Sequence, residues 1–365
     1  MLVASTGHKG YRSPTEACRR IAACIRQRHP RAVVETCPMA DGGDGTLEVC
    51  LKKVDGHTVF RTVRDSLFRP CKIPIGIYHQ NGVRKAIVEI ASAAGSASLP
   101  PHERQTMVAT SYGLGEALGH CMRLGCREVA FGLGGAIVSD AGLGMAQALG
   151  YKFFDRSGKR LQPLGNPGLN ALNLSGVHSF QPPRFPVWRD LRIHVLADVH
   201  IRLNGPRGQA RTFGPQKFAL EHEVKYLEEG FKNLARVWQR VLGRDFEGPG
   251  SGAAGGLGAG MQAFLGGALV SGAAWCGSVT GLDAAIQRNQ VVVTGEGKLD
   301  ATTFFGKAPL WVAQRARRFG RPVLAAVETI LISHHPLFQG IHRISDPQAM
   351  RKFHRLLAAN PRRHA

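Results

Sequence analysis

A run of β-branched residues passes directly into a charged glycine turn in the stretch VVVTGEGKLD, Val291 to Asp300. Its first four residues predict a buried strand, since strands covered on both faces read as continuous apolar runs. Glu296 sits between two glycines, and Lys298 and Asp300 follow it. Packing alone explains such a charged cluster poorly, whereas ligands of open α/β sheets bind beyond the carboxyl ends of strands. The stretch therefore predicts an α/β fold with chemistry at this turn.

Three further glycine-rich segments could also carry chemistry. They are MADGGDGT at residues 39–46, GLGGAIVSDAGLG at residues 132–144 and GPGSGAAGGLGAG at residues 248–260. Glycines expose backbone N–H groups, and helix N-termini add positive potential, so phosphates are favoured ligands of such turns. A structural role stays open for each segment, because an Asp in a tight turn often caps a helix and glycines allow close packing.

The last of these segments opens a helix that we expect to run through Leu269. Gly250, Gly252 and Gly255 match the spacing GxGxxG, but Pro249 precedes this pattern and no strand leads into it. A dinucleotide site is therefore weakly supported, since that motif follows a strand. A phosphate-binding helix start and close helix packing remain the two alternatives.

Two charged residues outside these segments also stand where chemistry is expected. Asp198 ends the strand LADV, a place for a general base or a metal ligand. Lys217 follows the Gly-Pro turn of FGPQK. Either side chain could instead be an ion-pair partner. The sequence contains no Walker-type phosphate loop and no HExxH zinc motif, so these two well-known sites are not expected.

Composition places the chain among ordinary globular proteins. The 365 residues are 44% hydrophobic and 20% charged, and this length favours two domains. No apolar run of about 18 residues and no signal-peptide pattern occurs, which argues against membrane-spanning and secreted proteins. The eight cysteines form no CxxC pair, so we expect reduced thiols in a cytoplasmic protein rather than zinc or thioredoxin-like chemistry.

The net charge of +21 could reflect nucleic acid, an acidic membrane surface or small anionic substrates as partners. The basic residues are spread along the chain, and the densest stretch is the tail from Arg351 onward. No zinc-finger or RNP-type aromatic pattern accompanies them. We therefore expect a solvated, Arg-rich surface that attracts small anions, without a membrane or nucleic-acid partner.

The order of the expected elements indicates an α/β protein with two domains. Short strands at residues 59–63, 71–78 and 85–90 are expected to pair antiparallel in an inserted β-rich piece. We expect a discontinuous Rossmann-like domain, a three-layer parallel-sheet domain, from residues 1–55, approximately 105–150 and 290–365. The rest, approximately residues 56–104 and 151–289, is expected to form an inserted mixed α/β domain.

Six segments carry a resemblance to a known family. In chain order they are PMADGGDGT, ATSYGLGEAL, GLGG with SDAGLGMAQALG, GPRGQARTFGPQK, GSGAAGGLGAGM and TGEGKLDATTFFGKAP. Together they resemble the bacterial glycerate kinase family, the glycerate 2-kinases of the two-domain α/β type, over roughly residues 1–325. The resemblance implies phosphorylation of D-glycerate at its 2-hydroxyl by ATP with Mg²⁺, in a cleft between the domains. Glycine turns with acids and cations suit phosphoryl transfer, which depends mostly on positioning and charge neutralisation.

This interpretation gives each candidate residue a role. The candidate catalytic residues are the carboxylates Asp198 and Asp300, with Lys9 as a charge stabiliser. The candidate metal ligand is Glu296. The expected nucleotide and phosphate contacts are Gly134, Gly135, Lys217, Gly250, Gly252, Gly255 and Gly256. The expected substrate contacts are Asp41, Gly42, Gly43, Asp140 and Lys307.

The sequence departs from the family pattern at three places. A family start like Ala-Pro-Asp-Ser-Phe-Lys-Gly reads Ala4-Ser-Thr-Gly-His-Lys-Gly10 here, so Thr6 replaces the Asp. A family turn like Gly-Gly-Ser-Ala-Thr-Asn-Asp reads Gly134-Gly-Ala-Ile-Val-Ser-Asp140, with changes at Ala136, Val138 and Ser139. Val327-Glu-Thr329 replaces a turn like Ala-Gly-Ser. Two alternatives therefore stay open: a catalytically impaired binding or regulatory protein, and a kinase of another small hydroxy acid.

Overall fold

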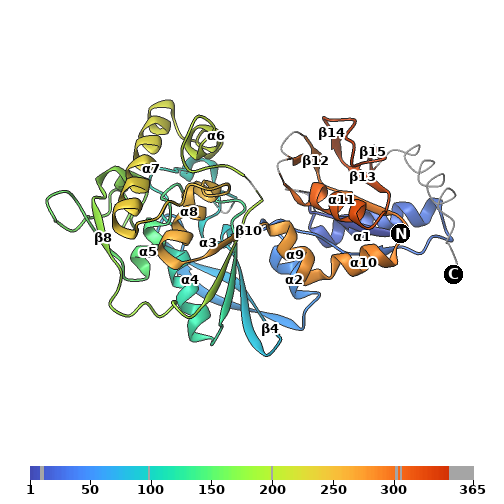
Figure 1. The fold of residues 1–365 in the computed structure, drawn as a ribbon, viewed down its shortest axis with the longest axis horizontal. Helices are drawn as coiled ribbons and strands as arrows, with labels where there is room; N and C mark the ends of the chain where they lie inside the picture. Colours follow the sequence, from blue (N-terminus) through green and yellow to red (C-terminus); the bar gives the residue numbers. More distant parts are fainter. Residues whose placement is uncertain (9–11, 98, 199, 301–302, 305, 345–365) are drawn as a thin grey trace. The chain divides into compact units, whose positions relative to one another are not determined.

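The computed structural model describes residues 1–8, 12–97, 99–198, 200–300, 303–304 and 306–344. The chain forms two compact units, and Figure 1 labels many of their helices and strands. The first unit contains Met1–Asp41, Glu48–Val54 and Ser271–Ala365. The second unit contains Gly42–Leu47 and Asp55–Val270.

A parallel five-stranded sheet forms the centre of the first unit, in the strand order β15-β13-β11-β1-β2. The strands are β1 (Leu2–Ser5), β2 (Glu35–Thr36), β11 (Val292–Gly295), β13 (Val323–Val327) and β15 (Gly340–Arg343). Every residue of β1 and β11 is buried. Leu2 pairs with Val292 and Ser5 with Gly295, so the start of the chain lies beside the strand that enters the charged glycine turn.

The helices of the first unit pack on this sheet or on one another. They are α1 (Pro14–Arg28), α9 (Gly272–Thr280), α10 (Leu282–Arg288) and α11 (Ala308–Arg318). Helix α1 starts with Ser13 as its N-cap, whose hydroxyl accepts a hydrogen bond from the Glu16 amide at 3.4 Å. Its buried face includes Ile21 and Ile25, which belong to the same apolar cluster as residues of β1, β11 and β13.

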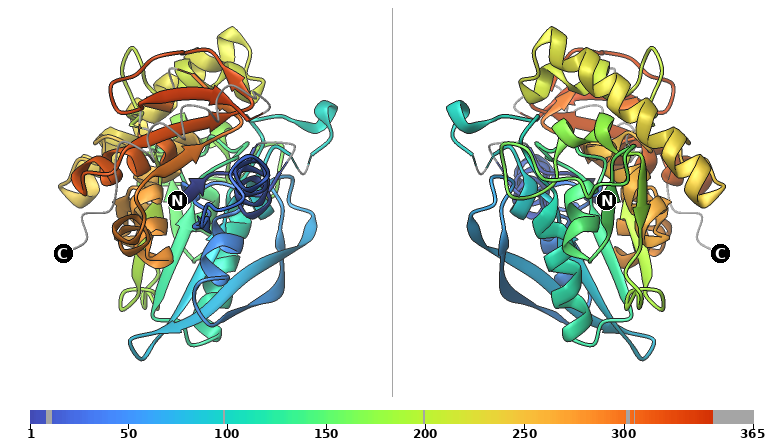
Figure 2. Two further views of the ribbon diagram at one scale, coloured as in Figure 1. Left: turned by 90° about the vertical axis from the view of Figure 1, so that its right-hand side faces the viewer. Right: turned by 90° about the vertical axis from the view of Figure 1, so that its left-hand side faces the viewer.

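A mixed six-stranded sheet forms the centre of the second unit, in the order β10-β9-β6-β5-β4-β3. The strands are β3 (Gly56–Arg64), β4 (Pro70–Gln80), β5 (Val83–Glu89), β6 (Glu128–Gly132), β9 (Arg192–Leu196) and β10 (Ala268–Val270). The four strands from β10 to β5 are parallel, and β4 and β3 continue the sheet antiparallel. Both views of Figure 2 show β3 and β4 as a long light-blue ribbon.

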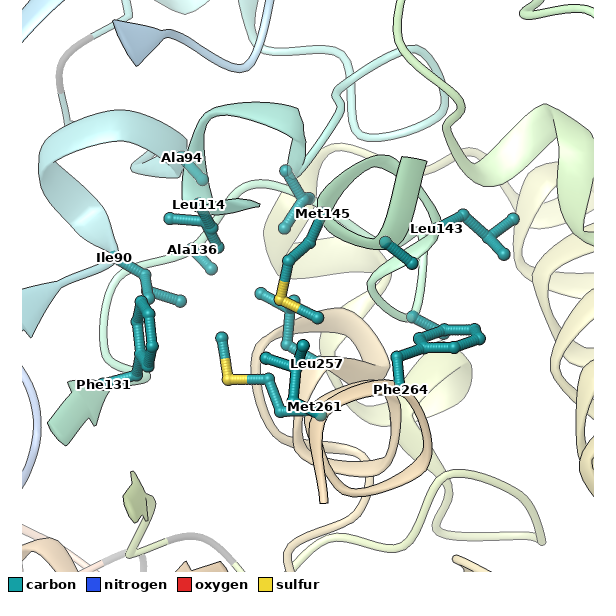
Figure 3. Close-up of a cluster of buried hydrophobic side chains, with 14 of the residues drawn as sticks. Ile90, Ala94, Leu114, Phe131, Ala136, Leu143, Met145, Leu257, Met261 and Phe264 are labelled. Carbon is teal, nitrogen blue, oxygen red and sulfur yellow. The ribbon is translucent and has the colours of Figure 1, made fainter. Parts of the chain in front are cut away.

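Helices of the second unit pack an apolar core against one face of this sheet. They are α3 (Ala91–Ala94), α4 (Tyr112–Arg123), α5 (Leu143–Ala148), α6 (Gln209–Phe213), α7 (Glu221–Leu242) and α8 (Ala253–Leu265). Figure 3 shows Leu114 of α4, Met145 of α5 and Met261 of α8 among the side chains of this core. Outside the two sheets, the described residues also form helix α2 (Thr46–Leu51) and two short strand pairs, β7 (Lys152–Phe154) with β8 (Ser179–Gln181) and β12 (Lys298–Leu299) with β14 (Thr329–Ile330).

The fold class expected from the sequence is confirmed: the protein is α/β, with parallel sheets and helices. The antiparallel β-rich piece is present as β3, β4 and β5. The helix expected to run through Leu269 was wrong at its end. Gly266 takes a left-handed conformation with φ of 68° and ends α8, and Ala268–Val270 then pairs with β9. Tertiary pairing thus overrides the helical pattern of these residues.

The compact units differ from the expected domains in three segments, one of which is Gly42–Leu47, expected with the chain ends and found in the second unit. Residues 105–150, expected with the chain ends, belong to the second unit because β6 pairs with β5 on one side and β9 on the other. Residues 271–289, expected in the inserted domain, belong to the first unit, where α9 and α10 pack with α11. Partner strands or helices elsewhere in the chain decide these assignments, and local pattern does not reveal them.

Among the residues that the structure describes, no helix has the length and apolar character that a membrane span needs.

Two glycine turns contact each other through backbone atoms in the second unit. A Cβ atom on Gly134 would lie 2.3 Å from the Cα of Gly43, and one on Gly132 would lie 2.5 Å from the Gly42 carbonyl oxygen. The Gly134 amide donates to that carbonyl at 3.0 Å. Only glycines allow this approach, so the glycines of the 39–46 and 132–144 segments bring the two segments together.

The third glycine segment packs against the second in the same way. Gly255 has a φ of 71°, and a Cβ atom there would lie 1.9 Å from the Val138 carbonyl oxygen. Its own carbonyl accepts from the Ala141 amide at 3.0 Å. Ala254, Gly255 and Gly256 are all left-handed, which interrupts the regular helix at this contact.

We expect Gly255→Ala to lower the free energy of unfolding by at least about 3 kcal/mol, because overpacking adds to the cost of a left-handed alanine. Gly266→Ala is the matched control, since Gly266 ends the same helix with a φ of 68° and has no neighbouring atom within 4 Å of an added Cβ. The control should lose only about 1 kcal/mol in urea denaturation. Equal losses in the two variants would show that the backbone at Gly255 has room for a side chain.

Candidate active site

The charged turn after β11 places Glu296 at the carboxyl edge of the first unit's sheet. The side chain of Thr303 connects this turn, since its hydroxyl donates to the Glu296 carboxylate and accepts from the Asp300 amide at 3.1 Å. Lys307 Nζ lies 3.8 Å from Glu296 Oε2, and Lys298 Nζ lies 3.7 Å from Asp300 Oδ2. Four charged residues of the family-like stretch therefore lie together.

Burial raises the pKa of Glu296 to about 7. The Thr303 hydrogen bond and the charge of Lys307 oppose this shift, while the charges of Asp41 and Asp300 strengthen it. Excess negative charge around a buried carboxylate favours a bound cation or a proton. The expected substrate residue Asp41 thus lies close enough to Glu296 for their charges to interact.

The side chains around Glu296 suit Mg²⁺ only in part. Among the residues that the structure describes, no group of three or more His, Cys, Asp and Glu side chains is arranged to hold a metal ion. Mg²⁺ in phosphate-transfer sites usually takes one or two carboxylates, with phosphate oxygens and water as its other ligands. Glu296 with Asp300 or Asp41 nearby fits that pattern, and a site made of protein ligands alone does not.

The turn after β1 carries one of the departures from the family. Thr6 uses its hydroxyl to donate to the Gly295 carbonyl at 3.2 Å, so it fastens β1 to β11. The candidate catalytic Lys9 lies outside the described residues. Because the Thr6 hydroxyl already donates to Gly295, it is part of the contact between β1 and β11.

A second departure builds a charged cluster that the sequence did not predict. Glu328 follows β13 and accepts from Arg12 Nη1 at 2.8 Å and Arg20 Nη1 at 3.0 Å. His8 Nδ1 lies 3.3 Å from the same carboxylate oxygen. Burial lowers the pKa of His8, although Glu328 opposes that shift. An acid after a buried strand was the signal that could have identified Glu328.

Lys217 lies against the second glycine segment in the second unit. Its Nζ donates to the Val138 carbonyl at 2.6 Å. Burial lowers the pKa of Lys217 to about 7, and the charge of Asp140 opposes this shift. The structure thus brings Lys217, Val138 and Gly255 to one place, since Gly255 contacts the same carbonyl.

Asp140, an expected substrate contact, is fully buried in the scaffold. Its carboxylate accepts from the Ser111 amide and hydroxyl, both at 2.8 Å, and from the amides of Gly142 and Gly144. Burial raises its pKa. Four donors occupy both oxygens, so the helix-cap alternative describes Asp140 better than a substrate contact.

The amides of the third glycine segment are already used within the unit. The Gly250 and Gly252 amides both donate to the Ile201 carbonyl at 3.0 Å, and the Gly256 amide donates to the Gly252 carbonyl at 3.3 Å. An amide that donates to a carbonyl is not available to a phosphate. Close packing, the second alternative for this segment, therefore describes Gly250, Gly252 and Gly256 better than phosphate binding.

Asp198 and Glu89 stand at neighbouring parts of the second sheet's carboxyl edge. Asp198 follows β9 and is 7% exposed. Glu89 is the last residue of β5, and its carboxylate accepts from the Leu47 amide at 2.8 Å. Sequence reasoning missed Glu89, although an acid at the end of a predicted strand was the signal.

Each unit thus places charged side chains at the carboxyl ends of parallel strands, beside glycine turns. Such an arrangement is typical of α/β proteins that bind anionic ligands at sheet edges. In the first unit the charged side chains include Lys307, Glu296 and Asp300, and in the second unit they include Lys217.

The model of the glycerate kinase family matches residues 1–351. A "Glycerate 2-kinase" of Escherichia coli (strain K12) is 33% identical over 325 residues, 89% of this chain and 84% of the relative. A "Glycerate kinase" of Halalkalibacterium halodurans is 31% identical over 342 residues, 93% of this chain and 88% of the relative. The chain belongs to the glycerate kinase family, and it is a kinase.

The fold agrees with that membership. A crystal structure of a protein assigned as glycerate kinase 2, from Salmonella typhimurium LT2, matches with a TM-score of 0.80 and 28% identity. The match covers 98% of this chain and 98% of the solved one.

We expect the affinity for ATP to fall as the pH rises through about 7. Lys217, whose pKa is lowered to about 7, is charged below that value and neutral above it. The affinity can be measured by calorimetric titration with ATP from about pH 6 to about pH 8. Over this range the affinity of wild type for ATP should fall by about tenfold relative to that of Lys217→Gln. About tenfold is the usual contribution of a charge-assisted hydrogen bond.

The titration of ATP itself is common to both proteins, so their difference isolates Lys217. Lys225→Gln is the control, because Lys225 is an exposed lysine that pairs with Glu221 at 3.0 Å. Parallel pH profiles for wild type and Lys217→Gln would contradict a phosphate contact at Lys217.

Proposed function

We propose that the protein transfers the γ-phosphoryl group of ATP to the 2-hydroxyl of D-glycerate, giving 2-phosphoglycerate and ADP, with Mg²⁺. The arrangement of Glu296, Thr303, Asp300 and Lys307 carries this proposal. It joins acids, a hydroxyl and a cation at the end of a buried strand, in the stretch most similar to the family. The relatives are named as glycerate kinases, which agrees with glycerate as the acceptor.

The reaction needs a base for the hydroxyl proton and neutralisation of the phosphate charge. The 2-hydroxyl oxygen attacks the γ-phosphorus, the bond from that phosphorus to the bridging oxygen of ADP breaks, and the hydroxyl proton passes to a carboxylate. Asp300 and Asp198 are the carboxylates that we propose for this proton. Both are partly or largely buried at strand ends, where a fixed carboxylate can orient a hydroxyl.

The remaining roles follow from charge and backbone. Lys307, Asp41, Gly42 and Gly43 are proposed to contact glycerate. Gly135 and Lys217 are proposed to contact phosphate, whereas the Gly134 amide already donates to the Gly42 carbonyl at 3.0 Å. Glu296 would hold Mg²⁺, which when bound neutralises charge on phosphate oxygens. Lys9 is proposed as a charge stabiliser on the basis of the family resemblance alone.

A kinase of another small hydroxy acid is the second candidate function. The observation that favours it is the loss of polar groups at Ala136 and Val138, since Val138 is fully buried and its carbonyl already accepts from Lys217. The Thr6 hydroxyl likewise already donates to the Gly295 carbonyl. A pocket with fewer polar groups discriminates less against analogues of its substrate.

The proposed activity can be tested directly with purified protein, ATP, Mg²⁺ and D-glycerate. Phosphorus NMR of the product should show a phosphate on the 2-oxygen, and D-lactate, which has the same configuration at C2 and no 3-hydroxyl, serves as the competing acceptor. Phosphate on the 3-oxygen would contradict the proposed position. Faster turnover of lactate than of glycerate would favour the second candidate, and absence of any phosphorylated product would favour an impaired binding protein.

We expect Asp300→Asn to lower kcat by about 100-fold or more, the usual contribution of general base catalysis, while thermal unfolding stays close to wild type. The matched control is Asp283→Asn, because Asp283 forms an ion pair with Arg315 on α11 and has no proposed part in the reaction. Near-normal turnover of Asp300→Asn would leave Asp198 as the candidate base.

A further inference from the structure

Glu89 connects the end of β5 to the first glycine segment. Its carboxylate accepts from the Leu47 amide at 2.8 Å, across a separation of 42 residues. The amides of Gly45 and Thr46 lie near this carboxylate and favour its charged form, while the Thr46 amide itself donates to the Gly43 carbonyl at 3.2 Å. The carboxylate is therefore bonded to the Leu47 amide and lies close to the two amides before it. An ionised carboxylate is the side chain best suited to accept several N–H groups at once.

The turn that Glu89 holds is fastened from two other sides. The Thr46 hydroxyl donates to the Gly43 carbonyl at 2.7 Å, which closes the turn internally. The Gly134 amide donates to the Gly42 carbonyl, and the Cα of Gly43 occupies the space of a missing side chain on Gly134. The turn thus has little freedom to shift without losing a contact.

Asp44 stands at the exposed part of this turn and points toward the second glycine segment. Its Oδ1 lies 3.7 Å from the position of a Cβ atom on Gly135, which is left-handed with a φ of 75°. The charge of Asp44 also raises the pKa of Glu89, so the two carboxylates lie close to each other. The anchoring of residues 45–47 by Glu89 therefore fixes where Asp44 stands relative to Gly135.

Burying the Glu89 carboxyl costs free energy, so another effect must favour a carboxylate at this position. Removal from water is the largest effect on this carboxyl, and it raises its pKa. A glutamine would accept one amide with little loss, yet its NH₂ group would oppose the remaining amides. Capping of α2 alone would stabilise the protein only a little, because this helix has only six residues. Fixing the geometry of a turn at a reaction site is a stronger reason.

We propose that Glu89 is a positioning residue for phosphoryl transfer, which holds the 42–47 turn so that Asp44 faces Gly135. This inference rests on the proposed function. Glu89 acts through the turn, and misplacement of a site by about 1 Å is enough to slow a reaction by about 100-fold.

Three variants test this role in the full-length protein. Glu89→Ala removes the acceptor, and Glu89→Gln keeps its shape and one acceptor oxygen. Glu116→Ala is the matched control, since Glu116 also accepts a backbone amide from another element, that of Arg64 at 2.6 Å, and has no proposed part in the site. The measurements are kcat and KM for D-glycerate, together with hydrogen exchange of the 42–47 amides by mass spectrometry.

We expect Glu89→Ala to lower kcat by about 100-fold and Glu89→Gln by about tenfold, with faster exchange at residues 42–47 in the same order. Glu116→Ala should keep kcat within about twofold of wild type at a comparable loss of thermal stability, because removal of either acceptor leaves one buried amide unpaired. If Glu89→Ala does not fold, the intermediate kcat of Glu89→Gln decides.

Wild-type turnover separates this inference from the function on which it rests. An active wild type in which both Glu89 variants match the Glu116→Ala control in kcat would overturn the positioning role alone. Unchanged amide exchange in a slow Glu89→Ala variant would overturn it as well, since the turn would not have moved. A wild type that phosphorylates no hydroxy acid would overturn the proposed function, and with it any role of Glu89 in transfer.

Discussion

Backbone contact between glycine turns is the constraint on which the second unit depends. The turn at Gly42 and Gly43 lies directly on Gly132 and Gly134, where added side-chain carbons would overlap backbone atoms. Gly255 meets Val138 in the same manner. Because these contacts have no flexible side chain to adapt, they fix three loops to one another tightly. The three loops are therefore held together by backbone contacts as well as by hydrogen bonds.

Each unit also contains one buried charge whose pKa lies near neutrality. Burial raises the pKa of Glu296 and lowers that of Lys217, both to about 7. Neither group is fully neutralised by its partners, since Lys307 is 3.8 Å from Glu296 and Lys217 donates to an uncharged carbonyl. A bound cation would favour ionised Glu296, and a bound anion would favour charged Lys217. Both groups are thus suited to ligands of a phosphoryl transfer enzyme.

The departures from the family pattern have different structural consequences. Thr6 has no carboxylate, unlike the Asp of the family pattern, and its hydroxyl connects the end of β1 to β11. Glu328 gains two arginines and His8 as partners, so a charged cluster stands where the family pattern has small residues. Val138 has no polar side-chain group, and its backbone carbonyl accepts a hydrogen bond from Lys217. The turn from Glu296 to Lys307, in contrast, keeps its polar side chains in contact with one another.

Sequence alone determined the features that depend on local pattern. The β-branched run before Gly295 indicated a buried strand, the strand-end acids indicated a site, and six ordered segments indicated the family. Pattern could not separate the roles of the glycines or of Asp140, because an amide or carboxylate looks the same in sequence whether it is free or already bonded. Only the tertiary structure decided that Gly250 and Gly252 donate to Ile201, that Asp140 is saturated, and that Glu89 anchors a turn 42 residues away. Such pairings depend on which distant segments meet, and that choice is made by the packing of the whole unit.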